Sequence, residues 1–525
     1  MKTAEIVILE TSDIHGNVYP INYGTNEAEA LGMAKLASIV QEERAQHRNV
    51  LLVDNGDLIQ GTPFTYHYVK KESDLPNPMI LAANRMQYDA AVFGNHEFNY
   101  GLASLERAVQ ESAFPWLSAT ILDGKTKEPY FGKPYVIKEL EHGIRVGILG
   151  LTTQYIPHWE KEENIKGLIF QDAVEAAKKW VQVLKGQENV DVVVVSYHGG
   201  FERDLDNGEP TELLTGENQG YAICEEVPGI DVLLTGHQHR KIAGTSINGV
   251  LIVQPGNNAT AIGKVILELE QHGAGWTCIR KESVLIEAAD AEPDAFILDQ
   301  LQTYEDAVQV WLDQPIGRIE GDMTVHDPLE IRMKDNPLIE FINRVQMQAA
   351  GTDISNTALF HNGAPGFPEQ VTMREVMANY IYPNTLAVIE ISGKDMLAAL
   401  EHSAAYFEQY DGSKVRVSEA FTTPKPQHYN YDMWEGIDYE INISRPVGKR
   451  VAKLEYKGGP VEMDKTYQVV LNNYRAGGGG DYIMYQGKPI IKEIPVDVSE
   501  LIANHFMEHP VVQAKVDHNW RVVHD

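Results

Sequence analysis

The sequence predicts a two-domain protein of the α/β (α+β) class. Its 525 residues are more than a single hydrophobic core usually spans. In the first half, short continuous apolar runs alternate with stretches of helical periodicity, which is typical of strands and helices packed in layers. Beyond residue 313 the composition changes, with more aromatic residues and a glycine run at residues 477–480. A second domain of mixed α and β structure is therefore expected there.

Seven apolar runs are candidate strands: residues 6–9, 50–53, 90–93, 144–149, 192–195, 232–234 and 251–253. Continuous apolar runs suit strands that are buried on both faces. Helical patterns lie between several of them, for example at residues 33–43 and 173–184. Polar residues follow at once where several of these runs end, so we expect a ligand site at the carboxyl ends of the strands.

One amphipathic helix is expected at residues 293–313. Apolar side chains recur there at helical spacing: Ile297, Leu301, Tyr304, Val308 and Trp311. Pro315 would end the helix. We place the domain boundary at this helix, which gives a first domain at residues 1–290, a linking helix at 291–315 and a second domain at 316–525.

The composition argues against some classes of partner. The formal net charge is −31, from 44 basic and 75 acidic residues. Such a charge disfavours binding to long nucleic acid and to an anionic membrane surface. No apolar run is long enough to span a bilayer. The two cysteines, Cys224 and Cys278, cannot build a disulfide framework or a thiolate metal cluster.

The first residues, MKTAEIVILETSDIHG, lead directly into a predicted strand. They lack the separate basic, apolar and small-residue regions of a signal peptide. We therefore expect a cytoplasmic protein. An exported or cell-wall-associated protein is the alternative, if an export signal precedes this sequence. The sequence leaves the oligomeric state open.

Five segments at the ends of apolar runs carry potential metal ligands: SDIHG at 12–16, DNGD at 54–57, GNHE at 94–97, SYHGG at 196–200 and TGHQH at 235–239. Together they offer seven side chains: Asp13, His15, Asp57, Asn95, His198, His237 and His239. Carboxylate, imidazole and amide donors suit divalent zinc, manganese, iron or cobalt. Asp13 and His15 are two residues apart, so an extended backbone would turn both side chains to the same side.

Each of these segments is weak evidence when taken alone. An isolated Asp-x-His is more often a turn or a helix cap, and His198 by itself could be a core histidine. A purely structural role is hard to accept for all five segments together, because every one of them follows a strand run in the same half of the chain. Seven ligands are too many for one tetrahedral ion. They fit two ions that share a carboxylate, an arrangement that clamps both oxygens of an in-line phosphoryl displacement.

The order of these motifs resembles that of the calcineurin-like metallophosphoesterases. The longer strings GDLIQGTP (56–63), GNHEFNYG (94–101) and TGHQH (235–239) resemble the bacterial 5'-nucleotidase and 2',3'-cyclic-nucleotide 2'-phosphodiesterase/3'-nucleotidase family. The resemblance covers nearly the whole chain. It implies an N-terminal layered β-sandwich flanked by helices, a linking helix and a C-terminal mixed α/β domain that binds the nucleotide.

The resemblance also implies how the ligands are shared between two divalent ions. One ion would be held by Asp13, His15, Asp57 and His239. The second would be held by Asp57, Asn95, His198 and His237, with Asp57 bridging. His96 would contact the phosphate and stabilise the transition state.

Two positions depart from many 5'-nucleotidases of this family, which have Asp where Asn99 stands and Gln where His239 stands. Both departures resemble the cyclic-phosphodiesterase branch. Asn99 could orient the His96 ring by a hydrogen bond, although it carries no charge. The alternative is that Asn99 only caps the helix expected at residues 100–110.

In the C-terminal domain, the resemblance implies that two aromatic rings hold the nucleobase between them. The matching strings are YNYD at 429–432 and NNYRAG at 472–477. Tyr474 is thus one candidate, and either Tyr429 or Tyr431 is the other. Asn362, in FHNGA at 360–364, aligns with a substrate loop. Half-buried strand tyrosines are the structural alternative.

The function expected from the sequence is metal-dependent hydrolysis of nucleotide phosphate esters, by a 2',3'-cyclic-nucleotide 2'-phosphodiesterase with 3'-nucleotidase activity. The alternative within enzymes is a 5'-nucleotidase or nucleotide-sugar pyrophosphatase that uses the same metals. A nucleotide-binding protein without turnover is the alternative outside enzymes.

Overall fold

The computed structural model describes residues 2–212, 214–273, 275–494 and 496–525. The chain forms two compact units of mixed α and β structure, Met1–Val308 and Gln309–Asp525. The division falls inside helix α7 (Ala295–Leu312), which is the helix expected from the apolar spacing. Among the described residues, none of the helices combines the length and the apolar character needed to cross a membrane.

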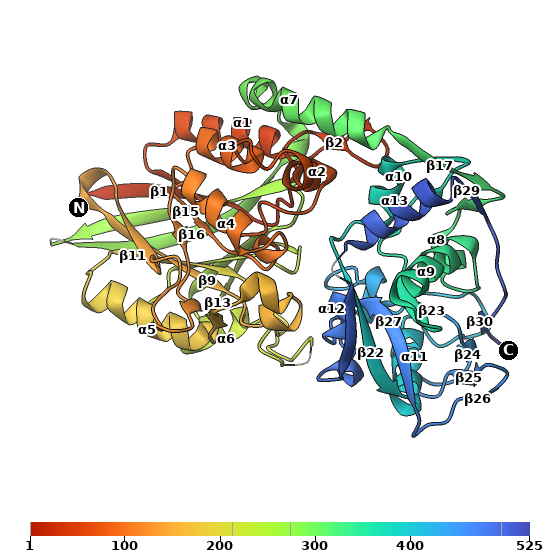
Figure 1. Ribbon diagram of the computed structural model, residues 1–525. Coiled ribbons are helices and arrows are strands. Elements are labelled where there is room, and N and C mark those ends of the chain that lie inside the picture. The colour runs from red at the N-terminus through yellow and green to blue at the C-terminus, as the bar shows by residue number, and fades with distance from the viewer. Residues whose placement is uncertain (1, 213, 274, 495) are drawn as a thin grey trace. The chain divides into compact units, whose positions relative to one another are not determined.

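Two six-stranded sheets make up the frame of the first unit (Figure 1). The first sheet has the order β16 (Gly275–Glu287), β15 (Ala261–His272), β1 (Thr3–Thr11), β4 (Val50–Asp54), β5 (Ala90–Val92) and β6 (Trp116–Leu117). The second has the order β13 (Lys241–Ile247), β14 (Val250–Pro255), β12 (Val232–Thr235), β11 (Val192–His198), β9 (Arg145–Thr152) and β8 (Tyr135–Glu139). All seven predicted runs overlap these strands.

The two sheets pack face to face as a β-sandwich. One core contains Ile8 of the first sheet together with Val192 and Val194 of the second. The alternate residues Val193 and Val195 belong to a different core, on the outer face of β11. This period-two division explains why the strands read as continuous apolar runs.

Helices cover the outer faces of the sandwich (Figure 1). Helices α5 (Ala173–Gly186) and α6 (Gly220–Glu226) pack on the second sheet, where Val181 and Ile223 join the outer core. Helices α1 (Met33–Gln46) and α3 (Pro78–Met86) lie on the side of the first sheet. The fold thus agrees with the layered β-sandwich flanked by helices.

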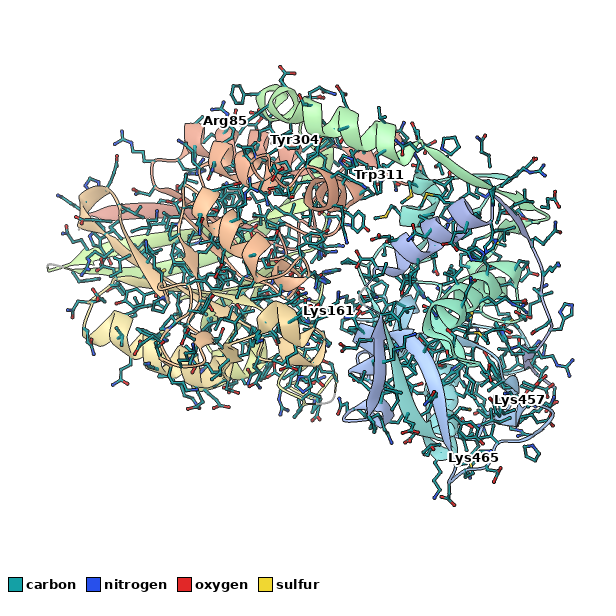
Figure 2. The ribbon with its side chains drawn as sticks, in the orientation of Figure 1. Arg85, Lys161, Tyr304, Trp311, Lys457 and Lys465 are labelled. Carbon is teal, nitrogen blue, oxygen red and sulfur yellow. The ribbon has the colours of Figure 1, made fainter. Side chains whose placement is uncertain are left out.

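Helix α7 carries Tyr304 in its first-unit part and Trp311 in its second-unit part (Figure 2). In the first unit, the Tyr304 hydroxyl donates a hydrogen bond to the Pro76 carbonyl at 2.9 Å. In the second unit, Trp311 packs against the core. Pro315, expected to end the helix, is the first residue of strand β17 (Pro315–Glu320).

The second unit is built around a five-stranded mixed sheet, with the order β23 (Asp432–Glu435), β19 (Ser355–Ala358), β27 (Thr466–Asn472), β22 (Leu386–Ser392) and β28 (Ile490–Ile494). Its core also includes residues of α9 (Pro337–Ala350), α11 (Gly393–Ala404) and α13 (Val498–Glu508). Two smaller sheets bring together distant parts of the chain. Strand β29 (Val511–Gln513) pairs with β17, and β30 (Trp520–Val523) pairs with β24 (Asp438–Asn442).

Candidate metal centre

The seven candidate ligands follow or end strands at the carboxyl edges of the two sheets. Asp13 and His15 follow β1, Asp57 follows β4, and Asn95 follows β5. His198 is the last residue of β11, and His237 and His239 follow β12. Strands β1, β4 and β5 run parallel, as do β11 and β12, so their carboxyl ends meet at one edge of each sheet.

Five of the seven ligand residues have a left-handed backbone. The φ angles are 51° at Asp13 and His15, 57° at Asp57 and His239, and 65° at His237. Side chains disfavour this conformation, which persists only where the surrounding structure enforces it, and such residues cluster at functional sites. The expectation that Asp13 and His15 converge from extended backbone was therefore wrong, because β1 ends at Thr11 and both residues have a left-handed backbone.

The first group of donors is gathered around His239. Its Nε2 lies 3.1 Å from Nε2 of His15 and 3.3 Å from Oδ1 of Asp13. His15 Nε2 is 3.9 Å from Oδ2 of Asp57. Two donors on one tetrahedral ion, each at about 2.0–2.1 Å, are separated by roughly 3.3 Å. The spacing of these atoms thus fits a shared divalent ion.

The second group is gathered around Asn95. Its Oδ1 lies 3.1 Å from Nε2 of His198 and 2.9 Å from Nδ1 of His237. His198 Nε2 is also 3.3 Å from Oδ2 of Asp57. Oδ2 of Asp57 therefore stands within 4 Å of a histidine nitrogen from each group.

In three of the histidines, the ring nitrogen that faces away from the other ligands lies within hydrogen-bond distance of an oxygen atom outside the ligand set. His15 Nδ1 lies 3.1 Å from the Gln60 carbonyl, and His198 Nδ1 lies 2.7 Å from the Asn55 carbonyl. His237 Nε2 lies 2.9 Å from a carboxylate oxygen of Glu217. Partners of this kind fix the ring orientation and leave the inward nitrogen as the donor, which is the usual arrangement around a metal.

The electrostatics of the site also suit cations. Asp13 and Asp57 are fully buried, and burial alone would raise their pKa values. The neighbouring histidines outweigh that effect and hold the pKa of each carboxyl well below its usual range. Burial lowers the pKa of His15 to about 3, so this ring is neutral. Burial would lower the pKa of His198, but the charges of Asp57 and Asp13 raise it to about 10. The His198 ring is therefore protonated without a metal, and a metal ion bound there would replace that proton.

Glycines allow the ligand loops to approach one another. A Cβ at Gly94 would overlap Oδ1 of Asp57, and a Cβ at Gly236 would overlap the side chains of Ser12 and Asp13. These are the glycines that precede Asn95 and His237 in the motifs. The motif glycines are therefore required by close packing between loops.

Glu97 of the GNHE segment holds two of these loops together. Its side chain is fully buried. One carboxylate oxygen accepts hydrogen bonds from the backbone N–H groups of Asp57 and Gly94, at 2.8 and 2.6 Å. The other accepts from Leu58 N–H at 2.7 Å. Glu97 thereby fixes the loop that carries Asp57, a role that its sequence motif does not predict.

A chain of side chains leads outward from His96. His96 Nδ1 lies 2.7 Å from Oδ1 of Asn99, whose Nδ2 donates to Glu160 at 2.7 Å. Glu160 also accepts a hydrogen bond from Asn164. Because a carboxylate only accepts, it orients the Asn99 amide with its oxygen toward His96. No local motif marks Glu160, which lies 61 residues further along the chain than Asn99.

In the second unit, the candidate tyrosines differ in burial. Tyr431 is fully buried and packs against Tyr406 and Phe407 in the core. Tyr429 and Tyr474 are only partly buried. The core position of Tyr431 leaves Tyr429 as the candidate partner of Tyr474.

Arg475 connects the two tyrosine segments. Its guanidinium donates to the Tyr429 carbonyl at 2.9 Å and pairs with Asp432 at 2.9 Å. The glycine run also has a role here, because a Cβ at Gly479 would lie 2.6 Å from the Tyr474 ring. Gly479 thus packs closely against Tyr474.

Asn362 is an exposed residue of the second unit. Its Oδ1 accepts a hydrogen bond from the buried Arg332 at 2.9 Å, and its Nδ2 lies 3.1 Å from Nε2 of His428. His428 immediately precedes Tyr429. Asn362 therefore lies near the Tyr429 segment.

A sandwich of two mixed sheets, with carboxylates and imidazoles at the carboxyl ends of its parallel strands, fits a metal-dependent phosphoesterase. Two family models match the chain: the calcineurin-like phosphoesterase model at residues 6–241 and the 5'-nucleotidase C-terminal domain model at residues 315–487.

Three known proteins illustrate the similarity. A 2',3'-cyclic-nucleotide 2'-phosphodiesterase/3'-nucleotidase of Salmonella typhimurium is 31% identical over 91% of this chain and 82% of its own length. The trifunctional nucleotide phosphoesterase protein YfkN of Bacillus subtilis is 28% identical over 98% of this chain, which spans 38% of that relative. The crystal structure of a candidate 5'-nucleotidase of Staphylococcus aureus in complex with alpha-ketoglutarate is 34% identical. The two structures superpose with a TM-score of 0.92, and the match covers 99% of this chain and 100% of the Staphylococcus aureus chain.

The chain therefore belongs to the calcineurin-like phosphoesterases that carry a 5'-nucleotidase C-terminal domain. It is a hydrolase that acts on phosphoric esters, and its fold implies divalent metal ions.

Proposed function

We propose that this protein is a two-metal 2',3'-cyclic-nucleotide 2'-phosphodiesterase with 3'-nucleotidase activity. The observation that carries the proposal is the position of Asp57 Oδ2, within 4 Å of histidine nitrogens from both donor groups. The substrate class is supported by the relative of that name in Salmonella typhimurium. Asn99 and His239, the two departures from the 5'-nucleotidase pattern, favour the same branch.

In this proposal, Asp13, His15 and His239 hold one divalent ion and Asn95, His198 and His237 hold the other. Asp57 bridges them. When bound, such a pair of ions activates water at neutral pH and neutralises phosphate charge. Zinc, manganese, iron and cobalt all suit the mixed oxygen and nitrogen donors.

His96 is proposed to act on the phosphate. Because Asn99 presents its amide oxygen to Nδ1 of His96, the ring carries its hydrogen on Nδ1. Nε2 is then the atom that can contact a phosphate oxygen. Glu160 holds Asn99 in the required orientation and is therefore a positioning residue.

Tyr429 and Tyr474 are proposed to stack on the nucleobase, with Arg475 fixing both segments. Stacking uses the π face that every base has, so the enzyme should accept several bases. Asn362 is proposed to contact the substrate from the neighbouring loop. The cytoplasmic location of the protein stays a prediction.

A substrate panel tests the proposal. Phosphate ester cleavage is measured side by side on 2',3'-cyclic AMP, 3'-AMP and 5'-AMP, with Mn²⁺ added to chelator-treated enzyme. We expect the highest kcat/KM on 2',3'-cyclic AMP, followed by 3'-AMP. A preference for 5'-AMP would support the 5'-nucleotidase alternative, and binding of all three without cleavage would support a nucleotide-binding protein.

A further inference from the structure

Four acidic side chains interact in the second unit. Asp335 precedes α9, Glu340 lies in its first turn, and Glu435 ends β23. Asp517 lies between β29 and β30, near the C-terminus. One carboxylate oxygen from each of Asp335, Glu340 and Asp517 lies within 4.8 Å of the others. Asp335, Glu340 and Glu435 are only 6%, 2% and 4% exposed.

Two oxygen atoms at this place are buried without a hydrogen-bond donor. One is Oδ1 of Asp335, whose other oxygen accepts from His518 N–H at 2.8 Å. The second is Oδ1 of Asn519, whose amide nitrogen donates to the Ile437 carbonyl. Buried polar atoms are nearly always paired, so each unpaired acceptor calls for an explanation such as an ion. Asp335 belongs to the acidic cluster, and the backbone N–H of Asn519 donates a hydrogen bond to Oδ1 of Asp517 at 3.2 Å.

The negative charge is incompletely balanced by protein groups. Arg344 contacts Glu340 at 2.5 Å and lies 3.5 Å from Asp517, but its side chain is 56% exposed. Burial and the charges of Asp517, Glu340 and Asp335 raise the pKa of Glu435 to about 8. Glu435 is therefore protonated at neutral pH, and the other three carboxylates beside one partly exposed guanidinium still leave a local excess of negative charge. A bound cation would remove that excess.

We propose that Asp335, Glu340, Glu435 and Asp517 bind one Ca²⁺ ion, with Asn519 as a further oxygen ligand. The donor set consists of oxygen alone, which suits a hard cation and separates it from the histidine-rich centre of the first unit. Asp517 N–H already bonds to Glu340, and His518 N–H bonds to Asp335. The ion would thus link the loop between β29 and β30 to the start of α9 and stabilise the second unit.

Calcium titration of the full chain tests this site. Chelator-treated wild-type protein and the Asp57→Asn variant are titrated with CaCl₂ by isothermal titration calorimetry, and thermal unfolding is recorded with and without Ca²⁺. Asp57→Asn removes the carboxylate that is proposed to serve both ions of the first unit, so Ca²⁺ binding there should weaken while binding at the acidic cluster persists. We expect saturable binding in both proteins with a Kd in the range of about 10⁻⁶–10⁻³ M.

Two variants assign the binding to the cluster. Asp517→Asn changes a partly exposed side chain and should fold normally, which circular dichroism checks. It should weaken Ca²⁺ binding at least tenfold and remove the Ca²⁺-dependent rise in Tm. Glu508→Gln removes the same charge from an exposed position of the same unit and is the control. It should leave both the Ca²⁺ affinity and the Ca²⁺-dependent rise in Tm unchanged. The proposal is overturned if Asp57→Asn shows no saturable Ca²⁺ binding, or if Asp517→Asn binds Ca²⁺ as tightly as wild type.

Discussion

Glu97→Gln should loosen the loop that carries the proposed bridging carboxylate. In the wild-type protein the two oxygens of Glu97 accept hydrogen bonds from Asp57, Leu58 and Gly94. A glutamine keeps the size of the side chain but replaces one oxygen by an NH₂ group, which cannot accept. At least one buried N–H group then loses its partner, and an NH₂ group faces it.

The expected cost follows from those contacts. A hydrogen bond to a charged group contributes about 1.5–3 kcal/mol, and an unpaired buried donor costs about 1–3 kcal/mol. Burial and the charge of Asp57 raise the pKa of Glu97 to about 6, so assays at pH 8 compare the carboxylate with the amide. We expect the first unit to lose roughly 2–5 kcal/mol of stability. Metal affinity should fall about 10–100-fold, as for other partners that orient metal ligands.

Two measurements check this prediction. Differential scanning calorimetry reports the Tm, and Mn²⁺ titration of chelator-treated protein reports the affinity. Glu29→Gln, an exposed change of the same kind in the first unit, is the control and should match wild type in both. Wild-type Tm and Mn²⁺ affinity in Glu97→Gln would refute the idea that this side chain positions Asp57.

Three further predictions concern the two proposed binding regions. Gly94→Ala should reduce kcat/KM at least about 100-fold, because the new methyl group meets Asp57; a misplacement of about 1 Å can cost that much. Gly186→Ala, where the space is open, should be neutral, and equal activities would contradict the packing argument. Tyr474→Ala should raise KM for nucleotides by the equivalent of about 1–3 kcal/mol, and for p-nitrophenyl phosphate by less. Equal changes on both substrates would indicate a structural tyrosine. Glu160→Gln should lower kcat about tenfold with unchanged metal content by elemental analysis, whereas loss of metal would show that Glu160 acts on the ligands instead.

The strands of the sandwich could be predicted because their sequence pattern is strong. Strand β11 is buried on both faces, so it reads as a continuous apolar run. The long hairpin of β15 and β16 was missed. Apolar and polar residues alternate in β15, which is itself a strand signal, but β16 carries the consecutive charged residues Arg280, Lys281 and Glu282 and shows no continuous apolar run.

The candidate site could be predicted as a set of residues but not as a geometry. The left-handed turns at Asp13 and Asp57 depend on contacts between loops that are distant in the sequence. Glu160 and Glu217 reach the site from such loops, and no local motif marks them. The choice between Tyr429 and Tyr431 also depends on tertiary packing, which places only Tyr431 in the core.

Metal content of the purified enzyme tests the two-metal centre most directly. Wild type and Asp57→Asn are stripped of metal, dialysed against Mn²⁺ in the presence of excess Ca²⁺, and then measured by elemental analysis and for hydrolysis of 2',3'-cyclic AMP. We predict two Mn²⁺ ions per chain and full activity in wild type. Asp57→Asn should hold at most one ion and lose nearly all activity, because one carboxylate serves both ions. Two tightly held Mn²⁺ ions and undiminished turnover in Asp57→Asn would contradict the bridging role of Asp57 and the two-metal account.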